Sequence, residues 1–403
     1  MSDRGEYAAR VVRTADVDQA TLDAWQRLED RSLEDNAFLS PHFVMPAVRY
    51  LAPAHPARAP FLVLVERQGE GPGSLAGLGV FERRPPTRQL PLPHLRAYES
   101  EYAYRSGLLV DRDRAPEVLE AFFRFCCGPQ ASWHAITFDG WRRDGELETL
   151  AFEHARRRGA RWFQWEEARR AVLTPRDGGD AHIARVLSAH RIRDLRQARQ
   201  RLEKRGRVGW RAYQGIAVEP SAVERLLVLE HMGWKREQGT SLRSRPAHES
   251  FFKDMVEGFR QAGRVVLNEL TVGDEVVASM CTIISGRTAF GFKLGWDPRY
   301  ARESPGMINM LEFVRAVPGI LESLDAIDSG SSEGSFVELL FSERWNLSSG
   351  AFSTTPLGRV VLAALEKLAR PKRAARRLMH AVSAKLKGSG PVDGAHRHAP
   401  PAR

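Results

Sequence analysis

A chain of 403 residues is longer than one hydrophobic core usually organises, so two domains are expected. Hydrophobic residues make up 43% of it and charged residues 27%, and nine tryptophans supply large side chains for packing, so a folded core is expected. The formal charge of +10 indicates an anionic partner: nucleotide phosphates, nucleic acid or an acidic membrane surface.

The cysteines and the apolar runs indicate which classes of protein are excluded. Cys126, Cys127 and Cys281 lie in apolar stretches, which does not indicate a disulfide framework or a zinc site, and we interpret all three as packing residues. The N-terminal stretch MSDRGEYAARVVR has no apolar signal-peptide core, and no run of about 18 apolar residues follows it. We therefore expect a cytoplasmic protein without a metal site.

The first half alternates helical and extended patterns, which is typical of a mixed α/β order. Helices are expected over 20–34, after Pro41, over 116–126 and over 146–158, and strands over 60–68, 75–84, 106–110, 134–140 and 161–167. The turn GEGPG between the first two strands predicts a hairpin. The loop TPRDGGD at 174–180 is the expected boundary, so the N-terminal lobe spans 1–175.

The second half repeats this order. Helices are expected over 183–205, 222–232, 248–261 and 306–317, and strands over 208–213, 264–272, 275–284, 288–296 and 324–330. Both halves read strand, tight turn, strand, third strand, helix, strand, as an ancient duplication would produce, although this is also a common α/β order. The C-terminal lobe is expected over 183–345.

The C-terminal segment is basic. A helical pattern over 357–387 is interrupted at Pro371, and residues 388–403 have the composition of a disordered tail. A basic amphipathic helix can lie on anionic lipid at the inner face of a membrane, and a solvated helix is the alternative.

The stretch GFKLGWDPRYARESPGMINMLEF predicts a strand, a loop and a helix start suited to an anion. Ser304 is the expected N-cap, Pro305 suits the first helical turn, and Gly306 permits close backbone approach. Arg299 and Arg302 stand just before the helix and add positive charge to its unpaired N–H groups. A pyrophosphate would fit there, but Ser-Pro-Gly is also a common capping pattern.

Three successive motifs, RDLRQARQRLEKRG, LEHMGWKREQGTSL and FKLGWDPRYARESPGM, resemble those of BioF2-like, CelD/BcsL-type acetyltransferase domains of the GNAT superfamily. They cover roughly residues 183 to 330, and the upstream part resembles the first lobe of FemABX-like tandem GNAT proteins. The resemblance implies an α/β (α+β) fold of two tandem GNAT-like lobes. Each would have a central mixed, mostly antiparallel twisted sheet flanked by helices.

The resemblance also implies the donor site. Acetyl-CoA would lie in a splay between strands 288–296 and 324–330, and Arg302, Ser304, Gly306 and Met307 would hold its pyrophosphate, chiefly through backbone N–H groups. The usual GNAT motif, Gln/Arg-x-x-Gly-x-Gly/Ala, is only partly matched here. After residue 328 the chain lacks the lysine that family members tend to show, and Glu333 or Glu338 is the candidate substitute.

Other polar residues are candidates for substrate contacts. Arg196 and Arg199 lie on a basic helix face that attracts phosphates or is simply solvated. Trp234, Lys235 and Gln238 lie in a Gly-containing loop of the kind that binds ligands, although Trp234 is equally suited to the core.

Acyl transfer requires a base for the acceptor and a proton or positive charge for the thioester. Lys293 is the expected charge stabiliser, Asp297 the base and Tyr300 the acid, although an Asp-Pro pair and a tyrosine also serve turns and packing. The N-terminal loop ESEYAYRSG, with Tyr102, Tyr104 and Arg105, suits acceptor contacts or a structural role, so that lobe is assigned to acceptor binding or scaffolding.

The hypothesis is an acyl-CoA-dependent N- or O-acetyltransferase acting on a cell-envelope or exopolysaccharide precursor. The first alternative is a FemABX-like transferase that takes its donor from charged tRNA, the one case in which nucleic acid is an expected partner. The second is a GNAT-fold scaffold without turnover in polysaccharide biosynthesis.

Overall fold

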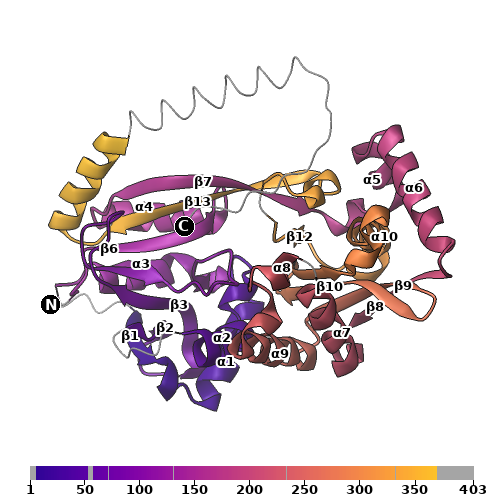
Figure 1. Cartoon of the computed structure of the whole chain (residues 1–403). Coiled ribbons are helices and arrows are strands. Elements are labelled where there is room, and N and C mark those ends of the chain that lie inside the picture. The colour runs from indigo at the N-terminus through magenta and orange to yellow at the C-terminus, as the bar shows by residue number, and fades with distance from the viewer. Residues whose placement is uncertain are drawn as a thin grey trace.

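The computed structural model describes residues 6–52, 58–70, 72–129, 131–232, 234–331 and 333–369. The basic stretch 372–387 and the tail 388–403 lie outside these ranges, and so does the expectation of membrane contact that rests on them. Figure 1 shows the whole chain.

The secondary structure follows the predicted alternation and adds strands over 7–13, 94–97 and 343–353 that were not predicted. The helices are α1 (Gln19–Asp30), α2 (Pro41–Leu51), α3 (Ala115–Cys126), α4 (Glu146–Arg157), α5 (Gly179–Val186), α6 (Ala189–Glu203), α7 (Pro220–His231), α8 (Trp234–Glu237), α9 (Pro246–Gln261) and α10 (Pro305–Ile320), with a further helix over 356–369. The strands are β1 (Tyr7–Arg13), β2 (Phe61–Arg67), β3 (Leu75–Arg84), β4 (His94–Ala97), β5 (Leu109–Val110), β6 (Ala135–Arg142), β7 (Trp162–Leu173), β8 (Val208–Gln214), β9 (Val265–Val272), β10 (Glu275–Ser285), β11 (Thr288–Trp296), β12 (Ala326–Asp328) and β13 (Glu343–Ser353).

The strands form one 13-stranded sheet in the order β1-β2-β3-β4-β6-β13-β7-β12-β11-β10-β9-β8, with β5 paired to β3. Among the described strands, two neighbouring pairs are parallel, β4 with β6 and β11 with β12, and the others are antiparallel. Each parallel pair is joined through a helix, α3 in the first half and α10 in the second. The predicted mixed, mostly antiparallel fold with two similar halves is therefore confirmed.

The last strand joins the two halves. β13 follows the second half in sequence, but it lies between β6 and β7 of the first half and pairs antiparallel with both. β7 is long enough to pair with β13 and then, at Val172 and Leu173, with β12 of the second half. Figure 1 shows β7 and β13 running side by side toward the second half.

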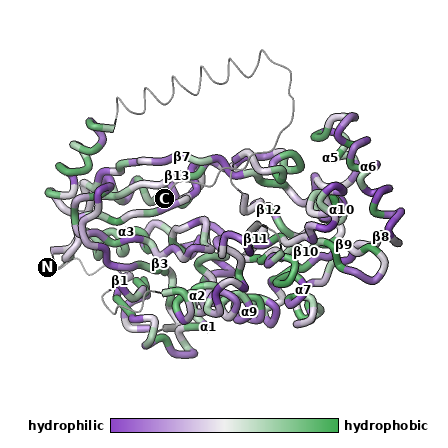
Figure 2. The backbone as a smooth tube through the Cα atoms, in the orientation of Figure 1, coloured by the Kyte–Doolittle hydropathy of each residue, from purple (hydrophilic) through white to green (hydrophobic). Residues whose placement is uncertain are grey.

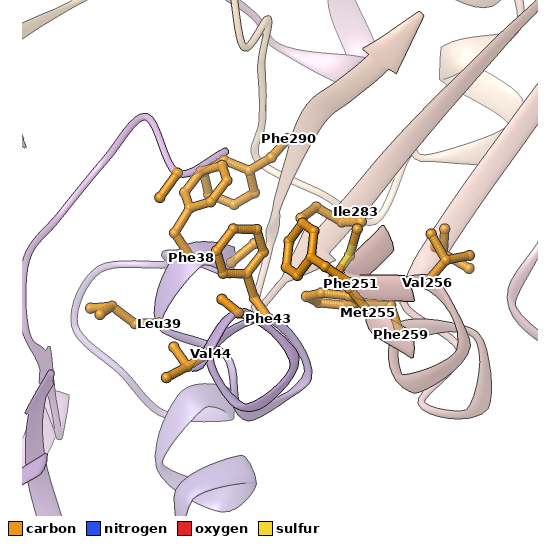
Figure 3. Packing of buried hydrophobic residues seen from close by; sticks show 14 of the residues in the cluster. Phe38, Leu39, Phe43, Val44, Phe251, Met255, Val256, Phe259, Ile283 and Phe290 are labelled. Atoms are coloured by element: carbon orange, nitrogen blue, oxygen red, sulfur yellow. The ribbon is translucent and has the colours of Figure 1, made fainter. Parts of the chain in front are cut away.

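The halves also share a core. Phe38, just before α2, contacts Phe290 of β11, with ring centroids 5.7 Å apart. Phe43 of α2 contacts Phe251 of α9, with ring centroids 5.4 Å apart. Figure 3 shows these rings facing one another, with Met255 and Phe259 nearby. Each fully buried ring contributes about 2–3 kcal/mol through loss of apolar surface. The interface between the halves is therefore built like the interior of a domain.

One predicted helix is wrong in its continuity. The stretch 183–205 is two helices, α5 and α6, because the Ser188 hydroxyl accepts a hydrogen bond from the Arg191 N–H at 3.2 Å and starts a new helix. α6 buries only Leu195, Ala198 and Leu202 and is hydrophilic over most of its length (Figure 2).

Within the described ranges, no helix has the length and apolar character required to cross a membrane.

Candidate functional site

The parallel pair in the second half opens into a wedge. β11 pairs with β10 over its length but with β12 only from Thr288 to Phe290, opposite Ala326 to Asp328. Beyond Phe290 no described strand pairs with β11 on the β12 side. Backbone groups on such an edge can bond an extended ligand, as in strand addition. We refer to residues 291–296 as the free edge of β11, in the sense only that no described strand pairs with them on this side.

A tyrosine from the first half closes the narrow end of this wedge. The Tyr104 hydroxyl donates a hydrogen bond to the Gly291 carbonyl at 3.0 Å. Gly330, with φ +64°, packs so closely that a Cβ there would lie 1.9 Å from the same carbonyl oxygen. Both glycine and the left-handed backbone are therefore required at residue 330.

Buried charges fix this junction. Asp328 is completely buried, its carboxylate accepts a hydrogen bond from the Gly330 N–H at 2.9 Å, and Arg170 Nε lies 3.8 Å from it. Burial raises the pKa of Asp328, while Arg170 and Arg105 oppose the rise. The Arg170 guanidinium also lies over the Tyr104 ring, 4.5 Å from its centroid. Asp328 and Arg170 thus orient the turn and the tyrosine that border the free edge.

Lys293, the predicted charge stabiliser, lies on the free edge, and its ammonium is 4.4 Å from the centroid of the Tyr102 ring. The backbone beside it is less open than expected, because α7 covers Gly295: a Cβ there would lie 2.5 Å from the Glu230 nitrogen. The cation is therefore held between the strand and the N-terminal loop that carries Tyr102.

The predicted base and acid lie in a separate cluster. Asp297 is 2% exposed, accepts a hydrogen bond from the Arg299 N–H at 2.9 Å, and forms an ion pair of 2.6 Å with the Arg299 guanidinium. The Tyr300 hydroxyl donates a hydrogen bond to the Glu275 carboxylate at 3.1 Å. The pKa of Tyr300 is raised, chiefly by burial and secondly by Glu275. The structure brings Asp297, Arg299 and Tyr300 together as the support of the turn between β11 and α10, apart from Lys293.

The start of α10 differs from the expected cap. Ser304 has a left-handed backbone, φ 49° and ψ 55°, and its side chain makes no capping hydrogen bond; its carbonyl accepts instead from the Met307 and Ile308 N–H groups. Gly306 and Met307 are buried, whereas Ser304 and Arg302 are exposed. Only the exposed pair can offer a side chain to a phosphate.

Arginines of α6 and of the residues just after it lie at this turn. Arg201 donates to the Arg302 carbonyl at 3.4 Å, and Arg205 donates to the Arg299 carbonyl at 3.2 Å. The Arg201 guanidinium therefore lies beside Arg302, where an anion at the start of α10 would meet it, whereas Arg205 is also paired with Glu303.

The predicted substrate residues fall in two places. Arg196 is exposed and Arg199 is ion-paired with Glu312, and both line a cavity of about 380 Å³ between α5, α6 and α10. Gln238 is exposed just after α8, and the side chains of Trp234 and Lys235 lie outside the described part of the structure.

Sequence reasoning missed the partners of Tyr102. Its hydroxyl is 2.7 Å from His248 Nδ1, and His248 Nε2 is 3.5 Å from Glu101. Burial lowers the pKa of His248, with Arg245 and Lys293 adding to the effect and Glu101 opposing it. Tyr102 was recognisable from its polar loop, but His248 fits the pattern of α9 as an ordinary helix residue, so nothing in the sequence singled it out.

The first half has its own cavity, of about 700 Å³, where β4 and β6 diverge. Trp165 lines it together with five basic residues, Arg84, Arg88, His94, Arg96 and Arg170. Glu99 is among its acidic residues; burial first, and then Asp139, raise the pKa of Glu99 to about 7. Tyr104 also lines this cavity, so one side chain borders both the cavity and the free edge of β11.

Comparison with known proteins agrees with this geometry. Residues 189–333 match the family model described as acetyltransferase (GNAT) domain. No curated protein matches the chain. Among solved structures, FemX is 10% identical with a TM-score of 0.54, over 83% of this chain and 95% of FemX. A conserved protein of unknown function from Bacteroides thetaiotaomicron is 12% identical with a TM-score of 0.52, over 84% of this chain and 98% of the other.

At these identities the structural matches establish the fold, and the family match establishes the domain that carries the free edge of β11. The family match supports an acyltransferase domain over residues 189–333. Residues 189–333 therefore match a GNAT acetyltransferase domain, and the fold of the whole chain is similar to that of FemX.

Proposed function

We propose that this protein is an acyl-CoA-dependent acyltransferase that moves an acyl group, acetyl in the simplest case, to an amine or hydroxyl of a cell-envelope or exopolysaccharide precursor. The observation that carries the proposal is the position of Tyr104. It lines the cavity of the first half and bonds the strand edge of the second, so an acceptor in the cavity would be separated from that edge by one side chain.

The donor side is supported by the free edge and by the turn before α10. When bound, acyl-CoA supplies a thioester carbonyl activated for attack. The backbone of residues 292–296 would bind its pantetheine, and Arg302, Ser304 and the Gly306 N–H would meet its pyrophosphate. The fit rests on the exposed Arg302 side chain and on backbone groups, because the Met307 side chain is buried.

The acceptor side is supported by the chemistry of the cavity. Four arginines match an acceptor that carries phosphate or carboxylate groups. Trp165 offers an apolar face for a sugar ring, and Glu99 and Asp139 offer carboxylates for hydroxyl or amino groups. A charged glycan precursor has all of these features.

Calorimetric titration of acetyl-CoA tests the donor assignment. We expect binding in the micromolar range, and we expect Arg302→Glu to weaken it at least tenfold, about 1.4 kcal/mol, by placing a carboxylate where the phosphates would lie. Arg27→Glu is the matched control, because Arg27 is an exposed arginine on α1, distant in the fold from α10. Equal binding by both variants would remove the phosphate assignment, and no binding by the wild type would remove acyl-CoA as donor.

Charged tRNA is the second candidate donor. It is favoured by the exposed arginines of α6, namely Arg191, Arg193, Arg196 and Arg201. Binding to a phosphodiester backbone weakens steeply with salt because counterions are released. Tight tRNA binding with a steep salt dependence, together with no binding of acetyl-CoA, would favour this candidate.

A further inference from the structure

Two residues of the N-terminal half and two of the GNAT domain meet beside the free edge of β11. Glu101 and Tyr102 lie in the loop after β4, His248 lies in α9, and Lys293 lies in β11. We propose that Tyr102, His248 and Glu101 form a proton relay that takes the proton from the acceptor during acyl transfer. This inference rests on the function proposed above and adds the group that performs its proton transfer.

The relay has the geometry of a hydrogen-bonded chain. The Tyr102 hydroxyl and His248 Nδ1 are 2.7 Å apart, and His248 Nε2 and the Glu101 carboxylate are 3.5 Å apart. The chain ends at solvent, since Glu101 is exposed, whereas Tyr102 is half-buried and His248, between them, is 8% exposed. A proton accepted at Tyr102 can therefore leave through His248.

The tyrosine is held rigidly in this position. Its ring stacks on Phe251 of α9 at 5.3 Å with an interplanar angle of 8°, and its edge meets Phe292 of the free edge at 6.5 Å. Catalytic proton transfer requires donors and acceptors held within hydrogen-bond reach, and stacking between α9 and β11 provides that without a flexible side chain.

The charges around His248 favour a neutral imidazole. Burial lowers its pKa, and the cations Arg245, just before α9, and Lys293 of β11 lower it further, whereas Glu101 opposes them. Above that pKa the imidazole is unprotonated at one nitrogen and can accept a proton from the Tyr102 hydroxyl. Glu101 then stabilises the imidazolium that forms, so the same carboxylate that lies near the resting histidine supports the charged one.

Lys293 connects the relay to the strand edge. Its ammonium lies 4.4 Å from the centroid of the Tyr102 ring and 5.6 Å from that of Phe292. A positive charge at this place stabilises negative charge that develops on the thioester oxygen. One residue of the free edge therefore borders both the reacting carbonyl and the proton acceptor.

The step balances as follows for an amine acceptor. The C–N bond forms as the thioester C–S bond breaks, and the sulfur leaves as a thiolate. The nitrogen gives one proton to the Tyr102 oxygen while Tyr102 gives its own proton to His248 Nδ1. The imidazolium of His248 releases its Nε2 proton to water beside Glu101, and water returns one proton to the thiolate.

The relay spans the two halves, because Tyr102 and His248 are separated by 146 positions in sequence. Glu101 and Tyr102 come from the half without the GNAT family match, and His248 and Lys293 come from the half that has it. The GNAT domain would therefore transfer acyl groups efficiently only with the first half in place.

The test uses the full chain and three variants, Tyr102→Phe, His248→Gln and Glu101→Gln. The rate of CoA release from acetyl-CoA is measured with D-glucosamine as the probe amine and with water alone as acceptor. We expect Tyr102→Phe and His248→Gln to lower kcat at least tenfold, in keeping with the hundredfold and larger effects of general bases, and to leave the acetyl-CoA Kd within about twofold. Tyr50→Phe, which loses a bond to Asp254 between α2 and α9, is the control and should keep wild-type kcat.

The pH profile separates a relay from a structural hydrogen bond. Wild-type kcat should rise through an inflection below pH 6.5, as His248 loses its proton, and this limb should vanish in His248→Gln. Glu101→Gln should move the inflection to lower pH, because the carboxylate that favours the imidazolium is gone. Unchanged kcat and an unchanged profile in the His248 and Tyr102 variants, with acetyl-CoA still bound, would overturn the relay alone.

A readout that needs no acceptor completes the test. In imidazole 15N NMR, saturation with acetyl-CoA should shift the His248 resonances of the wild type, and the shift should shrink in Tyr102→Phe. Saturated protein with unmoved His248 resonances would place the relay away from the donor and overturn the proposal. Failure of the wild type to bind acetyl-CoA would overturn the proposed function itself, and the relay with it.

Discussion

Replacing Tyr104 by phenylalanine isolates the hydrogen bond that joins the two halves at the wedge. The ring keeps its contact with Phe38, 4.2 Å between centroids, and its place under the Arg170 guanidinium. What is lost is the bond of 3.0 Å to the Gly291 carbonyl. A net hydrogen bond contributes about 1 kcal/mol, and a carbonyl left without a partner raises the cost, so we expect a loss of about 1–3 kcal/mol in the free energy of unfolding.

Tyr98→Phe is the matched control. The Tyr98 side chain is buried, but its hydroxyl has no hydrogen-bond partner within the described structure. Removing a buried hydroxyl that bonds nothing should leave stability unchanged or raise it, because its desolvation cost disappears. The same chemical change is thus expected to have opposite consequences at the two tyrosines.

Urea unfolding followed by tryptophan fluorescence measures both changes. A stabilised or destabilised variant shifts the midpoint at constant slope, which separates stability from a change in the unfolded state. A Tyr104→Phe protein as stable as the wild type, or a Tyr98→Phe protein destabilised by as much as Tyr104→Phe, would refute the reasoning about this contact.

Three other outcomes follow from single residues. Burial raises the pKa of Glu29 from 4.5 to about 7. The protonated carboxyl therefore contributes about 3 kcal/mol to the free energy of unfolding, in full below pH 4.5, and this contribution is lost as the pH rises through 7. In Glu29→Gln, the urea midpoint should no longer fall between pH 4.5 and 7. Gly330→Ala should lower the melting temperature far more than Gly273→Ala, since both glycines have positive φ but only the first would drive a Cβ into the Gly291 carbonyl; equal shifts would contradict this. Burial raises the pKa of Cys281 to about 12, so iodoacetamide at pH 8 should leave this thiol unmodified in the folded protein and alkylate it in urea, as mass spectrometry of the peptides would show.

The local elements of the second half were predictable because their signals are local. Strands 264–272, 275–284 and 288–296 alternate around turns at Gly273 and Gly286, both of which have the positive φ that the turns require. The antiparallel group therefore follows from a few adjacent residues. The motif before α10 likewise located the turn, although Ser304 caps through its carbonyl and not through its hydroxyl as predicted.

The candidate site was predictable only in part. Lys293 was found because its strand belongs to a recognisable motif, and the structure places it on the free edge. Asp297 and Tyr300 stay predictions as catalytic groups; in the structure they bond Arg299 and Glu275 in the supporting turn. Sequence spacing gives the order of polar residues along a loop, but it does not show which of their side chains form hydrogen bonds and ion pairs within the loop.

The sequence by itself determined most of the helices and strands, the antiparallel hairpins and the resemblance of residues 183–330 to a GNAT domain, since these depend on patterns within short stretches. It did not predict β1, β4 or β13. Only the tertiary structure decided the insertion of β13 between β6 and β7, the contact of Tyr104 with Gly291, and the meeting of Tyr102 with His248. These join residues separated by well over a hundred positions. Hydrophobic periodicity tells which face of an element is buried, but the partner of that face is chosen by packing across the whole chain.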